Sequence, residues 1–258
     1  MALSFGKRYA VAAHYTLLEQ LKNRLAIGLL LVFVPLWYYL AYVFTDAPTA
    51  FKFRATNTVL QVDALHLTLL TLGLNSITLI VGFMFFAATR KGMRFDSRLV
   101  LSGYPQLQLI LARLTALLVI SGIVALYASA ILFIFWRPVV LPLVWLSFFF
   151  GALIYGGLGI LLGVLVRGEL EGFFIIIMVS FIDSFIQNPI GNPAANKDFV
   201  EGFPAFAPTQ LAVAGGFTHV LPWLYILISL AWLVGFTLLG LLIFYLKTKA
   251  WNVHTIKK

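Results

Sequence analysis

The residues of this chain that could do chemistry are few, and they do not stand at spacings that enzymes use. The sequence contains no cysteine, which excludes thiol catalysis, disulfides and cysteine metal sites. The four histidines are far apart and show no His-Glu-x-x-His or other ligand spacing, so a zinc site is not indicated. We therefore predict that the chain is not an enzyme and holds no metal or cofactor of its own.

ATP binding would need the loop G-x-x-x-x-G-K-[S/T], because backbone amides and the lysine must surround the phosphates. The single Gly-Lys pair is Gly6-Lys7, and no glycine stands five positions before that glycine. Any ATP hydrolysis coupled to this chain is therefore predicted to belong to another polypeptide.

Three acidic residues are candidates for a role. Asp183 is the acid that lies deepest in an apolar run, where a carboxylate costs about 2.5 to 3.5 kcal/mol, so it should face protein or water. It is either a polar part of a translocation path or, the interpretation favoured here, a partner in a helix–helix hydrogen bond. Glu169 and Glu171 stand where an apolar run begins and suit a helix N-terminus; contact with a soluble partner is the alternative.

These residues must be positioned by membrane-spanning helices. Of the 258 residues, 62% are apolar and only 10% are charged, and the mean hydropathy is +0.99. A bilayer core needs roughly 20 apolar residues per helix. Runs of that kind predict six spans, at about 25–44, 65–88, 114–136, 139–166, 170–187 and 220–246. The predicted fold class is an all-α polytopic membrane protein.

The basic residues predict the orientation. Of the 18 Lys and Arg, 14 fall on the side of the N-terminus and four, Lys52, Arg54, Arg137 and Lys197, fall on the other side. Because cytoplasmic loops are rich in Lys and Arg, both termini are predicted to be cytoplasmic. The net charge of +9 is thereby explained without a nucleic-acid partner.

Three segments outside the spans differ in character. In the segment 1–24, apolar residues recur every three to five positions from Phe5 to Leu21, and charged residues fill the positions between them. This spacing predicts an amphipathic elbow helix in the cytoplasmic interface; a frayed tail is the alternative. The cytoplasmic segment 90–113 has helical spacing over 93–101, and a helix with charged and apolar groups suits a groove on a soluble partner. The outer segment 188–219 holds short apolar pieces and suits a re-entrant hairpin. Within the fourth span, Gly159 and Gly163 permit close helix packing, more simply inside the chain than between two copies.

The order of these features resembles the type 2 ABC-transporter permeases over nearly the whole chain. Three stretches carry the resemblance: Met93 to Pro105 ahead of Arg113, the polar turn at 167–172, and Phe203-Pro-Ala-Phe-Ala-Pro208 before the last span. Proteins of that family have an elbow helix, six spans, a coupling helix between spans two and three, and re-entrant helices between spans five and six.

The resemblance implies a permease subunit of an exporter in the inner membrane. Its partners would be separate ABC ATPase subunits, which bind ATP and Mg, and a second permease, identical or related. The residues implied to couple to the ATPase are Arg94, Phe95, Asp96, Arg98 and Leu99. A hydrophobic or amphipathic substrate fits the composition only in general terms. The rival functions are a stand-alone secondary transporter or channel, and a non-transporting scaffold or immunity protein.

Overall fold

The computed structural model describes residues 5–44 and 47–255, except for the side chains of Leu25, Phe44, Arg94, Ser97, Leu241 and residues 244–255. The described chain is mostly helical. Its elements are α1 Phe5–Leu21, α2 Arg24–Phe44, β1 Pro48–Phe53, β2 Thr58–Asp63, α3 Ala64–Leu101, α4 Gln106–Phe135, α5 Leu141–Leu165, α6 Glu169–Gln187, η1 Asp198–Gly202, α7 Phe206–Phe217 and α8 Trp223–Thr255.

Five of the described helices, α2, α3, α4, α5 and α8, are long and apolar enough to cross a membrane. These helices cover the first four predicted spans and the last one. The fifth predicted span is a 19-residue helix, α6, which carries Glu169 and Glu171 in its first turn and is not among the five. The multi-pass membrane character of the chain is therefore confirmed, whereas the count of six spans stays a prediction.

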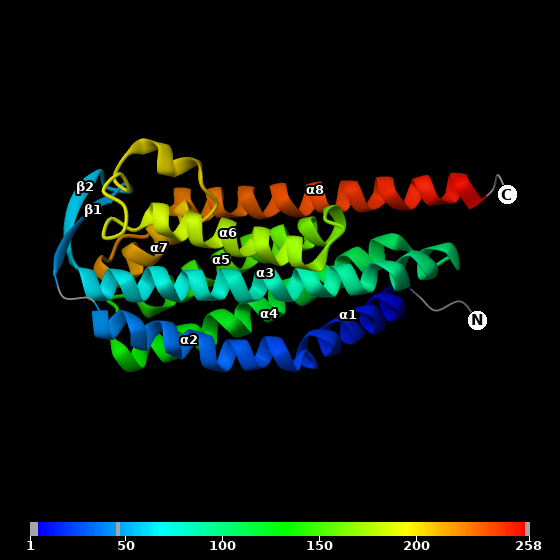
Figure 1. Cartoon of the computed structure of the whole chain (residues 1–258), viewed down its shortest axis with the longest axis horizontal. Helices are drawn as coiled ribbons and strands as arrows, with labels where there is room; N and C mark the ends of the chain where they lie inside the picture. The colour runs from blue at the N-terminus through cyan, green and yellow to red at the C-terminus, as the bar shows by residue number, and fades with distance from the viewer. Residues whose placement is uncertain (1–4, 45–46, 256–258) are drawn as a thin grey trace.

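The long helices run side by side along the longest axis of the molecule (Figure 1). At one end lie the start of α1, the end of α3 and the turn between α5 and α6; we call this the basic end. At the other end lie the strands β1 and β2 with the segment between α6 and α7, and we call this the hairpin end. The loops that the sequence predicts to be cytoplasmic thus lie toward the basic end, and the predicted outer loops lie at the hairpin end.

Helices α3 and α5 form the centre of the bundle, and their glycines set how closely they pack. A side chain at Gly159 would collide with the carbonyl of Gly82 on α3. A Cβ at Gly163 would lie 2.8 Å from Cβ of Thr89 and 3.0 Å from the carbonyl oxygen of Phe86. The Gly-x-x-x-Gly motif is therefore buried in intramolecular packing, as expected from the sequence.

A row of polar side chains joins α3 to α6. The Asn75 amide donates to the carbonyl and the hydroxyl of Ser180 and to the hydroxyl of Ser184, each at 3.0 Å. Thr78 and Ser180 share a further hydroxyl hydrogen bond of 2.8 Å. Hydrogen bonds of this kind hold helices together where lipid gives no hydrophobic driving force between them. They fix α6 against the core although its outer face is apolar.

The antiparallel hairpin of β1 and β2 departs from the all-α expectation. Its register pairs Phe51 with Leu60 and Phe53 with Thr58, and the inward side chains Phe51 and Phe53 are buried. Alternate residues of a strand face opposite sides, so this short pattern covers the bundle with one face only. Asn57 takes a φ of 51° in the turn, a conformation that asparagine tolerates.

The segment between α6 and α8 folds into η1 and α7. Helix α7 has 12 residues, too few to span a bilayer. Residues Phe206 to Gly216 are all buried, packed against α5, α8 and α3. The short apolar pieces predicted in 188–219 are thus buried in protein, and their depth in a membrane stays a prediction.

Residues 93–101 do not form a separate helix. Helix α3 continues without a break from the span into residues 93–101 and ends at Leu101. Nothing in this stretch stops a helix, since Gly92 keeps an ordinary helical φ. Gly103, with a φ of 87°, and Pro105 then turn the chain into α4. The expected interfacial helix is therefore a rigid extension of the second span.

Candidate functional site

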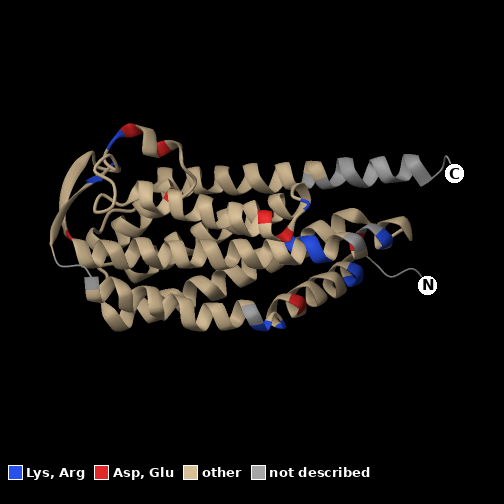
Figure 2. Ribbon diagram, in the orientation of Figure 1, with Lys and Arg blue, Asp and Glu red and all other residues tan. Residues whose placement is uncertain are grey.

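The basic end gathers positive charge on several elements. Lys and Arg residues concentrate there, and few lie along the middle of the bundle (Figure 2). Lys22 and Arg24 lie at the junction of α1 and α2, and Arg90, Lys91 and Arg98 lie on the last part of α3. Exposed Glu19, Glu169 and Glu171 lie among these basic residues, but positive charge is in excess, which suits an acidic partner or anionic lipid heads.

The five residues implied to couple to an ATPase do not all face the same way. Phe95 is 63% exposed and Arg98 is exposed, so both are available to a partner. Leu99 is half-buried and faces α1. The side chain of Arg94 lies outside the described residues.

Asp96 turns inward instead. It is only 8% exposed, and its carboxylate forms an ion pair with Arg113 on α4. Burial raises the pKa of the Asp96 carboxyl, and the Arg113 guanidinium opposes that shift. The structure therefore places Asp96 in a bridge between α3 and α4 and away from the solvent-facing surface. This contact fixes the angle at which the end of α3 projects.

The turn between α5 and α6 is tied to α3 by Arg90. The Arg90 guanidinium donates to the carbonyl of Val166 at 2.7 Å and also to that of Arg167. These are carbonyls at the C-terminal end of α5, where a cation is favourable. The Nε atom of Arg90 lies 3.7 Å from a carboxylate oxygen of Glu169. Glu169 thus lies in the first turn of α6 and pairs with Arg90, a partner that the sequence did not indicate.

Glu171 folds back over the start of α6. Any side chain at Gly168, the N-cap position, would meet the Glu171 carboxylate at 2.8 to 3.0 Å. A carboxylate in the first turn is favourable near the positive helix end. Both glutamates remain largely exposed, so their contact with an ATPase stays a prediction.

The elbow segment forms the predicted helix, α1, and it packs on protein. The Tyr9 hydroxyl lies 2.6 Å from the Thr115 hydroxyl on α4, and Tyr104 donates to the Arg8 carbonyl at 2.7 Å. Phe5 and Tyr15 on this helix are exposed. Force on the start of α4 would therefore reach α1 through direct contacts.

Asp183 lies at the other end of α6 and is 1% exposed. It accepts hydrogen bonds from the Tyr155 hydroxyl at 2.7 Å, the Ala205 backbone N–H at 2.8 Å and the Gln187 amide at 3.4 Å. These donors come from α5, from the segment before α7 and from α6 itself. The geometry favours the structural interpretation of Asp183, and a role in a translocation path stays a prediction.

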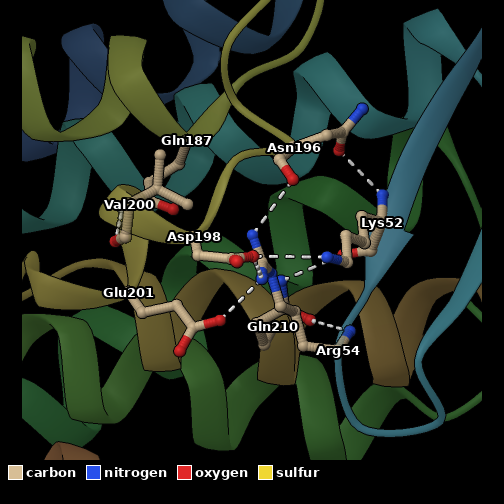
Figure 3. A network of polar contacts seen from close by, with 8 residues as sticks. All are labelled: Lys52, Arg54, Gln187, Asn196, Asp198, Val200, Glu201 and Gln210. Carbon is tan, nitrogen blue, oxygen red and sulfur yellow. Dashed lines mark hydrogen bonds and ion pairs between the residues drawn. The ribbon is translucent and has the colours of Figure 1, made fainter.

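A second polar cluster closes the hairpin end (Figure 3). Arg54 follows β1, and its side chain is 8% exposed. It forms ion pairs of 2.6 Å with both Asp198 and Glu201 and donates to the Asn196 carbonyl at 3.1 Å. Hydrogen bonds from Arg54 and Lys52 lower the pKa of the Asp198 carboxyl. We call Lys52, Arg54, Asp198 and Glu201 the hairpin clasp.

Several of these contacts had little signal in the sequence. Arg113 is 17 residues from Asp96, and only the fold brings them together. Arg54 is more than 140 residues from its acidic partners, although opposite charges in two loops of the same side were a weak indication. Among the residues that the structure describes, no group of His, Cys, Asp and Glu could hold a metal ion.

Comparison with known proteins gives no relative from which a function could be transferred. No protein-family model matches the sequence, and no curated protein matches it.

Proposed function

We propose that this chain is the membrane-spanning subunit of an ATP-driven ABC exporter of the type 2 permease kind. A separate ATPase supplies ATP hydrolysis, and the chain pairs with a second permease in the cytoplasmic membrane. In this proposal α6 completes a set of six spans, both termini are cytoplasmic, and α7 is a re-entrant helix of the outer side.

The observation that carries the proposal is the continuation of α3 beyond the membrane. The candidate span on this helix ends at Met93, and the helix runs on to Leu101. It presents exposed Phe95 and Arg98 at its end, with Leu101 also exposed. An apolar ring and a guanidinium are the groups that anchor protein interfaces.

Contacts at the base of this extension would carry motion into the bundle. Asp96 and Arg113 link it to α4, and Arg90 links it to the α5–α6 turn. A push on the end of α3 therefore acts on α4, α5 and α6 together. Such rigid-body displacement is how an ATPase outside the membrane could alternate the access of a path between two permeases.

Charge reversal at the end of α3 tests the proposal. In Arg98→Glu the chain should keep its fold, because the side chain is exposed and has no described ion pair. Co-purification of the ATPase with the tagged chain should fall by more than about tenfold, since a repulsive charge at an interface costs several kcal/mol and about 1.4 kcal/mol already gives tenfold. Arg94→Glu belongs to the same test.

The matched control is Arg137→Glu, an exposed arginine in the turn between α4 and α5 at the hairpin end. It makes the same charge change and should leave the complex intact. Unchanged association and unchanged coupled ATPase activity in Arg98→Glu would refute the coupling assignment.

The rival class, a stand-alone secondary transporter or channel, would show paired repeats and broken, charge-bearing helices at mid-membrane. Asp183 is the acid nearest to that description, and its carboxylate is occupied by three donors. We therefore keep the permease as the proposed function. The transported substrate is not assigned.

A further inference from the structure

A groove lies between α1 and the last part of α3 at the basic end. Its volume is about 540 Å³, and residues of α1, α3 and the start of α4 line it. A second hollow of about 480 Å³ adjoins it, and the two share Glu19, Gln20, Ala88 and Lys91 in their walls. Together they form one continuous groove under α1.

Gln20 is the unusual residue of this groove. Its side chain is 1% exposed, and neither its amide nitrogen nor its amide oxygen has a hydrogen-bond partner. A buried amide without partners costs about 1 to 3 kcal/mol, so such groups normally mark an absent ligand or water. Gln20 lines both hollows, where it could donate to one ligand oxygen and accept from another group.

The part of the groove next to Gln20 has an apolar wall followed by a basic one along α3. Phe85 and Ala88 lie within the candidate span Ala64–Met93, and Lys91 lies at its end, about 9 Å beyond Phe85 along the helix. Lys22 and Arg24 add positive charge beside Lys91. This part thus passes from the apolar level of the candidate span to a basic zone, as a phospholipid molecule does, and the groove continues beyond it past Phe95 and Leu99.

The charges of the groove favour an anion. Lys22, Arg24, Lys91 and Arg113 line it, against the two carboxylates of Glu19 and Asp96. Asp96 is already neutralised by Arg113, which leaves the three basic residues nearest Gln20 opposed only by Glu19. Basic pockets between helices at the end of a membrane span bind anionic lipid heads.

We propose that this groove binds one anionic phospholipid. An acyl chain lies against Phe85 and Ala88, the glycerol ester oxygens accept from the Gln20 amide, and the phosphate lies among Lys91, Lys22 and Arg24. The bound lipid fills the space under α1 and joins the elbow helix to α3. This binding does not depend on the proposed ATPase coupling.

The test uses the purified full chain in nanodiscs of phosphatidylcholine with a minor fraction of phosphatidylglycerol that bears a photoreactive acyl chain. Illumination should attach the probe to peptides of α1 and of α3 near Phe85 to Leu99. Lys91→Gln should lower this labelling roughly fivefold, the usual effect of one lysine near an anionic surface. Lys197→Gln makes the same charge change at the hairpin end and should leave it unchanged.

The variant Gln20→Leu distinguishes a ligand-binding role of Gln20 from a structural role. Because it removes an unpartnered amide, its unfolding temperature in phosphatidylcholine alone should not fall, while its labelling should fall several-fold. Should this variant fail to fold, the exposed Lys91 variant decides the question.

Three results would overturn the proposal. The first is equal labelling by a phosphatidylcholine probe, which would show that the head group is not recognised. The second is unchanged labelling in Lys91→Gln, or an equal loss in Lys197→Gln. The third is displacement of the probe by soluble glycerol 3-phosphate, which would make a soluble phosphate and not a lipid the occupant.

Discussion

Several buried polar side chains of this bundle are satisfied by contacts between segments that are distant in sequence, in contrast to the amide of Gln20. Asp183 is the clearest case, because its three donors come from three segments of the chain. A carboxylate that is fully occupied in this way holds the start of α7 against α5 and α6. We expect the role of Asp183 to be structural.

Asp183→Leu should destabilise the protein strongly. It leaves the Ala205 N–H buried without an acceptor, at about 1 to 3 kcal/mol, and leaves the Tyr155 hydroxyl with only a long 3.5 Å hydrogen bond to the Val179 carbonyl. Thermal unfolding of the detergent-purified chain, followed by size-exclusion chromatography, measures the loss. Glu169→Gln, an exposed change on the same helix, serves as the control.

Asp183→Asn gives the complementary result. Its amide oxygen can still accept from Tyr155 and Ala205, so much of the stability should return. An Asp183→Asn protein that is fully stable but no longer supports coupled ATPase activity would contradict the structural role and favour the translocation path.

Helix packing depends on small residues where α3 and α5 cross. Gly159 allows the backbone of α5 to touch the Gly82 carbonyl, and no larger residue fits there without movement. Gly235 on α8 differs, since nothing lies within 4 Å of a side chain added at that position. Gly159 and Gly235 can therefore be compared as a crowded site and an open site on two long helices.

Gly159→Ala should destabilise the protein by about 1 to 3 kcal/mol, the usual cost of overpacking a core. Gly235→Ala should be neutral or slightly stabilising, because alanine favours a helix over glycine. The unfolding temperature of the two variants in the same detergent checks this. Equal stability of both would show that the α3–α5 contact is not close-packed.

The sequence predicted the long helices well because an apolar run of span length has few other stable forms in lipid. It did not predict the β1–β2 hairpin, since two strands of six residues give only a brief alternation beside much longer apolar runs. It predicted a helix over 93–101 but not that this helix is continuous with the second predicted span in α3.

The candidate site was predictable in part. Exposed Phe95 and Arg98 lie on the segment that the sequence assigned to a partner. The inward turn of Asp96 could not be foreseen, because its partner Arg113 belongs to the next helix. The groove at Gln20 was also beyond sequence reasoning, since it is formed by three helices together.

The molecule as a whole has two chemically different ends. Positive charge concentrates at the basic end, whereas the hairpin end holds acids and bases in the hairpin clasp (Figure 2). The positive-inside rule predicts that the basic end is cytoplasmic. Every functional proposal above uses this orientation except the lipid site.

Labelling of single cysteines checks the orientation, since the natural chain has no cysteine. In intact cells a membrane-impermeant maleimide should label Thr56→Cys, in the exposed hairpin turn, and should not label Ala10→Cys on α1. Ala10→Cys should react only after the membrane is permeabilised. The opposite pattern would invert the topology.

The central claim is that a separate ATPase drives this chain, and isolation of the native complex tests it most directly. The tagged full-length chain is purified from its own cells in a mild detergent, and the bound proteins are identified and tested for ATP hydrolysis. We predict that an ABC ATPase with a phosphate loop co-purifies and is lost in Arg98→Glu but not in Arg137→Glu. A chain that purifies without any ATPase, yet moves a solute in reconstituted vesicles without ATP, would contradict the account.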